Sequence, residues 1–133
     1  MMVWTGHVRR DIMKRILIAD DHPIMRKELK QLFSETDDMM VTGEASDGGQ
    51  VLDMVSKGGY DLVLLDISMP VKNGFEVLKG LRSGHPHIPV IILSMHPQEQ
   101  YASRALKAGA SAYITKERAS EELVSAVREI CLK

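Results

Sequence analysis

The chain has 133 residues, of which 44% are hydrophobic and 26% are charged, as in an ordinary single globular domain. Its 17 basic and 18 acidic residues leave a net charge of −1, which excludes a general electrostatic attraction to nucleic acid or anionic lipid. No apolar run approaches the ~20 residues that cross a bilayer, and the single cysteine, Cys131, cannot form an internal disulfide. We therefore expect a protein without a membrane span in a reducing cytoplasm.

The first part of the chain lacks a clear period. We expect residues 1–12 to be a flexible N-terminal extension and residues 13–133 to form the domain. From Met13 onward, short apolar runs alternate five times with segments of helical periodicity. The runs predict strands at 15–19, 39–44, 62–65, 90–93 and 112–115.

Apolar stripes at helical spacing predict amphipathic helices between the strands. The stripes are Met25, Leu29, Leu32 and Phe33; Leu78 and Leu81; Ala102, Ala105, Leu106 and Gly109; and Leu123, Ala126, Val127 and Ile130. Helix ends are indicated by Asp47 before the second helix, Gly58 after it, Pro97 in a first turn and Ser120 as an N-cap. Parallel strands with right-handed crossover helices make a doubly wound α/β sandwich.

Polar residues directly follow four of the predicted strands. They are Asp20 and Asp21, Asp66, Ser94, and Lys116. Any one of these residues can be explained by the start of a loop, but in open α/β sheets the functional crevice lies at the carboxyl ends of the strands. Together they indicate one site at that edge.

Three acids at one edge require a neutralising partner. At about 6 Å and an effective dielectric constant of 20, each carboxylate pair repels by roughly 3 kcal/mol. Either protonation or a bound cation would relieve this repulsion. The donors are oxygens, so a hard cation is expected, and Mg²⁺ fits a site with few carboxylates beside a phosphate. His22, next to the acidic pair, is interpreted as a loop or helix-start residue, because no second histidine has suitable spacing.

A carboxylate nucleophile, a divalent ion, a lysine and a hydroxyl suit phosphoryl transfer to an aspartate. In this hypothesis Asp66 attacks phosphorus to form an acyl phosphate, while Mg²⁺ and Lys116 offset the charge on the transferring oxygens. The hydroxyl of Ser94 can donate a hydrogen bond to one of these oxygens. No separate general base is needed, since an ionised carboxylate has no proton to lose.

Residues 14–132 resemble the receiver domains of bacterial two-component response regulators. The matching motifs, in family order, are Asp20-Asp21, Asp66 within LLDISMP, Lys72-Asn73-Gly74, Ser94, Gly109-Ala110 and Lys116. The resemblance implies a flavodoxin-like (βα)5 fold with strand order 2-1-3-4-5. It also implies that Asp66 is the phosphoacceptor, that Ser94 and Lys116 hold the phosphoryl group, and that Asp20, Asp21, Asp66 and the backbone carbonyl of Ser68 bind Mg²⁺. The donor would be a phosphohistidine on a sensor histidine kinase.

The amino-acid sequences of three segments are similar to those of the NarL/FixJ-type branch of this family. They are ADDHPIMRKELKQLF, ILSMHP and ALKAGASAYITKERASEEL. This branch implies transcription regulation through a C-terminal helix-turn-helix DNA-binding domain, which is absent from the chain. The alternative is a stand-alone receiver that acts through protein-protein interaction. Ser94 and Tyr113 match the family's switch pair, and a homodimer on phosphorylation is a further expectation.

Other readings of the same residues are weaker. A haloacid-dehalogenase-type phosphatase needs a second Asp where this chain has Ser68, and a flavin carrier needs a phosphate loop where Asp20 and Asp21 stand. A degenerate receiver would have lost an acid or the lysine. We therefore expect a phosphoacceptor that assists its own chemistry, not an enzyme that turns over an external substrate. Met39, Met40, Met69, Met95 and Cys131 are predicted to be packing residues, and the isomer of the peptide bond between Lys116 and Glu117 stays open.

Overall fold

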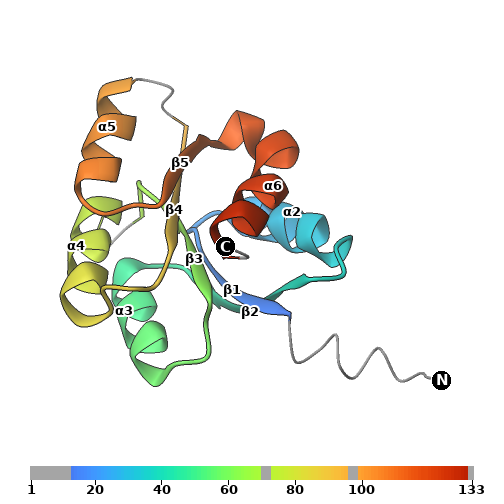
Figure 1. The fold of residues 1–133 in the computed structure, drawn as a ribbon, viewed down its shortest axis with the longest axis horizontal. Coiled ribbons are helices and arrows are strands. Elements are labelled where there is room, and N and C mark those ends of the chain that lie inside the picture. Colours follow the sequence, from blue (N-terminus) through green and yellow to red (C-terminus); the bar gives the residue numbers. More distant parts are fainter. Residues whose placement is uncertain (1–12, 70–72, 96–98, 132–133) are drawn as a thin grey trace.

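The computed structural model describes residues 13–69, 73–95 and 99–131. Five parallel strands form one sheet of order β2-β1-β3-β4-β5 (Figure 1). The strands are β1 (Lys14–Ala19), β2 (Met39–Ala45), β3 (Leu62–Asp66), β4 (Val90–Ser94) and β5 (Ala112–Thr115). The predicted order and the doubly wound α/β class are therefore confirmed.

Helices cover both faces of the sheet. They are α2 (Pro23–Ser34), α3 (Gly48–Lys57), α4 (Gly74–Gly84), α5 (Glu99–Lys107), the 3-10 turn η1 (Lys116–Arg118) and α6 (Ala119–Cys131). On one side, α3, α4 and α5 enclose a core with odd-numbered residues of β1 and β3, such as Leu17 and Leu65. On the other side, α2 and α6 enclose a second core with the alternating residues, such as Ile18 and Leu64 (Figure 1). The continuous apolar strands follow from burial on both faces.

Local sequence signals set several helix ends. The side chain of Asp47 accepts a hydrogen bond from the backbone N–H of Gln50 and caps α3, as predicted. Gly58 follows α3 at φ 81°, a left-handed conformation that glycine adopts without steric cost. Asn73 and Glu76 form a reciprocal capping box at the start of α4.

Three sequence expectations about side-chain environment or helix limits are wrong. Ser120 is not an N-cap, because η1 leads directly into α6 and that helix begins one residue earlier. Leu106 is 50% exposed, and only its neighbour Ala105 is buried in α5. Met95 and Met40 are 73% and 38% exposed, whereas Met39 and Met69 are buried as expected. Met95 follows the last residue of β4, and Met40 lies in β2, an edge strand of the sheet.

Other expectations concern the chain ends and one peptide bond. The predicted extension 1–12 and Pro97 lie outside the described residues. Cys131 is half-buried against the α2/α6 core, and burial raises the pKa of its thiol, as expected of a packing residue. Every peptide bond of the described residues is trans, including the one between Lys116 and Glu117. In the described part of the chain, no helix is long and apolar enough to cross a membrane.

Candidate metal and phosphoryl site

Strand alternation brings three of the predicted site residues to one face of the sheet edge. Ile18, Leu64 and Ile114 all point into the α2/α6 core from β1, β3 and β5. Because side chains alternate along a strand, the residue two positions further on has the same direction. These residues are Asp20, Asp66 and Lys116.

The ammonium group of Lys116 lies between two buried carboxylates. Its Nζ is 2.9 Å from Asp20 Oδ2 and 3.3 Å from Asp66 Oδ2, and only 8% of its side chain is exposed. Burial opposes the charged form of Lys116, but the hydrogen bond to Asp20 and the attraction of both carboxylates outweigh it and raise its pKa. The lysine therefore supplies part of the neutralisation that the sequence required.

Asp66 is the end of β3 and is almost fully buried. Burial raises the pKa of its carboxyl group; the backbone N–H of Ser68 and the charge of Lys116 oppose this, and the charge of Asp20 adds to it. The Ser68 N–H donates to Asp66 Oδ1 over 3.1 Å. This bond fixes the carboxylate and leaves its other oxygen directed at Lys116.

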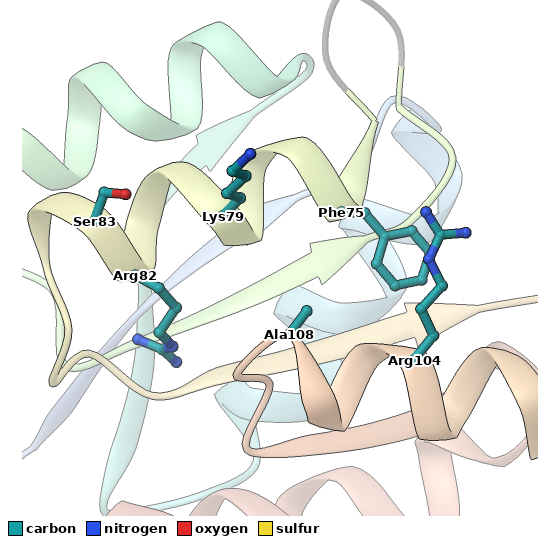
Figure 2. A pocket seen from close by; sticks show the side chains of 6 residues that line it. All are labelled: Phe75, Lys79, Arg82, Ser83, Arg104 and Ala108. Carbon is teal, nitrogen blue, oxygen red and sulfur yellow. The ribbon is translucent and has the colours of Figure 1, made fainter.

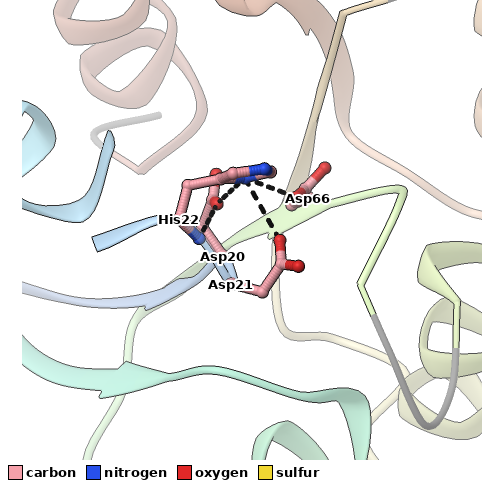
Figure 3. A group of neighbouring side chains, drawn as sticks. All are labelled: Asp20, Asp21, His22 and Asp66. Atoms are coloured by element: carbon pink, nitrogen blue, oxygen red, sulfur yellow. Dashed lines mark hydrogen bonds and ion pairs between the residues drawn. The ribbon is translucent and has the colours of Figure 1, made fainter. Parts of the chain in front are cut away.

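Asp21 and His22 complete the group (Figure 3). The ring nitrogen Nδ1 of His22 is 2.9 Å from Asp20 Oδ1 and 3.1 Å from Asp21 Oδ1. The backbone N–H of His22 also donates to Asp20 Oδ1 over 2.8 Å, and Arg26 Nη1 donates to the Asp20 carbonyl over 2.7 Å. The expectation that His22 starts a helix is confirmed, since it is the N-cap residue of α2, but its ring also belongs to the acidic site.

The three acids fit a bound cation. One oxygen of each carboxylate is buried and has a cationic or ring nitrogen as its neighbour in the described part of the protein: Asp20 Oδ2 and Asp66 Oδ2 face the Lys116 ammonium, and Asp21 Oδ1 faces His22 Nδ1. Buried carboxylate oxygens without hydrogen bonds are costly unless a positive charge compensates them. Lys116 and His22 lie within ion-pair distance of these oxygens. Each of the three acids also offers one carboxylate oxygen within 4.8 Å of the others, and such a group of oxygens is the donor set that a hard divalent ion uses.

The remaining predicted residues lie around this group. Ser94 ends β4, next to β3 in the sheet, and is fully buried. Strand alternation directs it to the side of the sheet that α3, α4 and α5 cover, and half-buried Tyr113 packs against the core on that same side. The two members of the predicted switch pair thus share a face. The role of the Ser68 carbonyl as an ion ligand stays a prediction.

A groove lies between α4 and the end of α5 (Figure 2). The guanidinium of Arg104 stacks 4.0 Å from the ring centroid of Phe75. Arg82 Nε donates to the carbonyl of Gly109 over 2.8 Å, and burial lowers its pKa. The residues that line this groove are Phe75, Lys79, Arg82, Ser83, Arg104 and Ala108. We interpret the groove as a packing seam that ties α4 to the turn before β5.

Sequence reasoning did not identify two supporting residues. Arg26 is four positions after His22, so its position one turn into a helix that starts beside the acids could have indicated contact with them. Arg82 had no local signal, because its partner Gly109 is 27 residues away in the sequence.

The sequence and the fold both match known proteins. Residues 16–128 match the family model of the response regulator receiver domain. The chain belongs to this family. The receiver is 39% identical over 114 residues to the nitrate/nitrite response regulator NarL of Escherichia coli, an alignment that covers 86% of this chain and 53% of NarL. It is similar to the signal receiver domain of the putative response regulator NarL from Mycobacterium tuberculosis, with 30% identity, a TM-score of 0.84, and coverage of 90% of this chain and 97% of that one.

A third similarity concerns a complex with an ion. The receiver also matches a chain in the CheX-CheY-BeF3-Mg²⁺ complex from Borrelia burgdorferi, with 26% identity, a TM-score of 0.86, and coverage of 95% of each chain. The chain spans about half the length of the first curated relatives, 49% to 53%. Its sequence similarity to the NarL proteins supports the predicted NarL/FixJ-type branch.

Proposed function

We propose that this receiver accepts a phosphoryl group on Asp66 from a phosphohistidine of a sensor histidine kinase, in a reaction that depends on Mg²⁺. The observation that carries the proposal is the buried Asp66 carboxylate, whose Oδ2 lies 3.3 Å from Lys116 Nζ at the carboxyl edge of the sheet. A carboxylate held beside an ammonium is suited to attack phosphorus while the incoming oxygens are neutralised.

The transfer exchanges one bond for another. An Asp66 oxygen forms a bond to phosphorus, the bond from phosphorus to the donor imidazole nitrogen breaks, and its electron pair stays on that nitrogen. Lys116 faces the carboxylate and would pair with a phosphoryl oxygen. The hydroxyl of Ser94, which is buried at the end of the neighbouring strand, would donate to another phosphoryl oxygen.

Asp20, Asp21 and Asp66 would hold the ion, with the Ser68 carbonyl as a further ligand. A divalent ion at this position would offset negative charge on the transferring oxygens. The related Borrelia complex is one that contains Mg²⁺ and BeF3. A bound ion would also balance the negative charge of three carboxylates that gather around one ammonium.

The output of the receiver is transcription regulation in this proposal. The chain aligns with about half of relatives that are described as transcriptional regulators, including DegU of Brevibacillus brevis. We propose that phosphorylation shifts Ser94 and Tyr113 and thereby controls a C-terminal helix-turn-helix DNA-binding domain. A receiver-driven homodimer and a cytoplasmic location belong to the same proposal. Helix-turn-helix coding sequence directly downstream would support it, and a stop codon after Lys133 in the native gene would instead support the stand-alone receiver.

Intact-mass spectrometry tests the chemistry. With acetyl phosphate and Mg²⁺ the protein should gain the mass of one phosphoryl group, and it should gain none in EDTA. Asp66→Asn should abolish the gain. Asp53→Asn is a matched control, because Asp53 is an exposed acid on α3 that pairs only with Lys57 among the contacts described for it. A phosphorylated Asp66→Asn variant would reassign the acceptor.

A further inference from the structure

The ring of His22 has a position that its place at the start of α2 does not explain. As the N-cap residue it makes no side-chain hydrogen bond to the helix. Instead its ring nitrogen Nδ1 forms a hydrogen bond with Asp20 Oδ1 and lies within ion-pair distance of Asp21 and Asp66 (Figure 3). The bond from its backbone N–H to Asp20 Oδ1 holds the backbone of this residue beside the site.

The spacing of the donor atoms matches a coordination polyhedron. In an octahedral site with metal-ligand distances of about 2.1 Å, adjacent ligands are about 3 Å apart and opposite ligands about 4.2 Å apart. His22 Nδ1 is 2.9 Å from Asp20 Oδ1, 3.1 Å from Asp21 Oδ1 and 3.9 Å from Asp66 Oδ2. One donor atom from each of the four residues lies within 4.8 Å of all the others.

Independent support comes from the buried oxygens of the same residues. Asp20 Oδ2 and Asp66 Oδ2 belong to side chains that are 1% and 2% exposed, and both face the same Lys116 ammonium, at 2.9 and 3.3 Å. Lys116 supplies one positive charge for these two carboxylates and Asp21 together. Three carboxylates therefore share one ammonium, and a cation bound beside the imidazole nitrogen would balance the remaining negative charge.

We propose that His22 is a metal ligand through Nδ1 and sets the metal preference of this site. The inference rests on the proposed function, because it uses the carboxylates assigned there to Mg²⁺. Carboxylates suit Mg²⁺, whereas an imidazole nitrogen suits transition metals, whose affinity for such a donor set rises from Mn²⁺ to Co²⁺. With His22 the receiver binds Mn²⁺ and Co²⁺ more tightly, relative to Mg²⁺, than the three acids alone would.

Metal titrations of the whole chain test this assignment. Binding of Mg²⁺, Mn²⁺ and Co²⁺ is measured by isothermal titration calorimetry for the wild type, His22→Ala and the control His87→Ala, whose histidine is exposed in the turn before β4. His22→Ala should weaken Co²⁺ binding by about tenfold or more, because even the loss of a residue that only orients a metal ligand has an effect of about that size. The loss should be smaller for Mn²⁺ and least for Mg²⁺, and His87→Ala should resemble the wild type.

A spectroscopic measurement separates direct ligation from an indirect effect. Pulsed electron paramagnetic resonance of the Mn²⁺ complex should show a ¹⁴N coupling from a directly bound imidazole in the wild type and in His87→Ala, and none in His22→Ala. Circular dichroism of each variant checks that the fold is kept. If His22→Ala alters all three affinities equally, or the ¹⁴N coupling is absent from the wild type, His22 is not a ligand and the assignment is overturned.

The outcome can be distinguished from failure of the proposed function. If the wild type binds Mg²⁺ and is phosphorylated on Asp66 while His22→Ala leaves the metal preference unchanged, only the role of His22 is refuted. If the wild type binds none of the three ions and acetyl phosphate adds no mass, both proposals are refuted.

Discussion

Gly109 and Arg82 offer a quantitative test of how the turn before β5 is held. Gly109 has φ 107°, and a Cβ added there would lie 2.8 Å from Arg82 Nε and 2.9 Å from its Cδ and Cγ. Arg82 donates to the carbonyls of Gly109, His85 and Pro86 over 2.8, 3.3 and 3.4 Å. An alanine at position 109 therefore meets two obstacles, a strained backbone and an occupied space. This turn matters for the site because it leads into β5 and then Lys116.

The two costs can be separated. A non-glycine residue in the left-handed region costs about 1–2 kcal/mol, and displacing the Nε hydrogen bond of a charged donor costs about 1.5–3 kcal/mol. Gly109→Ala should thus lower the free energy of unfolding by about 2.5–5 kcal/mol. In an Arg82→Ala background the space is open and only the backbone cost remains, so the two mutations should be non-additive by about 1.5–3 kcal/mol.

Urea denaturation followed by circular dichroism measures the four corners of this cycle. Gly84→Ala is the control, because a Cβ there would have no heavy atom within 4 Å and no positive φ is involved; it should be neutral or stabilise by less than about 1 kcal/mol. Additive effects of Gly109→Ala and Arg82→Ala within about 0.5 kcal/mol would refute the steric argument, as would a Gly109→Ala cost equal to that of Gly84→Ala.

Three other predictions concern the site and its surroundings. Burial raises the pKa of Asp66 in the folded protein. The contribution of this carboxyl group to stability is therefore full below its unfolded pKa and is lost as pH rises through its folded pKa. In EDTA, Asp66→Asn should gain stability over the wild type with rising pH, and a pH-independent difference in urea midpoints would contradict this. An added Cβ at Gly74 would meet backbone atoms of Ile67 and Asp66. Gly74→Ala should therefore lower the free energy of unfolding, measured by urea denaturation, by about 1–3 kcal/mol, and it should slow phosphoryl uptake in the mass assay. Unchanged values of both would refute the contact. The hydrogen bond from Arg128 lowers the pKa of Asp38 in the folded protein. Arg128→Ala should therefore lower the free energy of unfolding above the unfolded pKa of Asp38, and this difference from the wild type should vanish as pH falls through the folded pKa. A difference that persists in acid would show that the ion pair is not the cause.

The strands and the identity of the site residues could be predicted because their signals are local. The run before Asp66 is apolar at every position, as burial on both faces requires. Each of the five strands was predicted to within one residue of its observed limits. Alternation along the strands then places Asp20, Asp66 and Lys116 at one edge. The helix limits were less predictable: Ser120 looked like an N-cap, but η1 had already begun the helical turn that α6 continues.

Exposure at element ends could not be read from periodicity. Leu106 lies on an apolar stripe in the sequence, yet it is half-exposed, and Ala105 is the buried residue of α5. Met95 follows directly after a buried strand and is 73% exposed, because the sheet ends at Ser94. A helical or strand period gives a direction for each side chain, but whether another element covers that direction depends on the tertiary arrangement.

The sequence by itself determined the fold class, the strand order through the family resemblance, and the set of acidic, hydroxyl and ammonium groups at one edge, since these depend on residue types and on periods of two and 3.6 along the chain. Only the tertiary structure decided how those groups share charge. Lys116 lies between Asp20 and Asp66, the ring of His22 lies among three carboxylates, and Arg82 holds Gly109. Such contacts join atoms from distant parts of the chain, and distances of about 3 Å are fixed by packing, which no local pattern encodes.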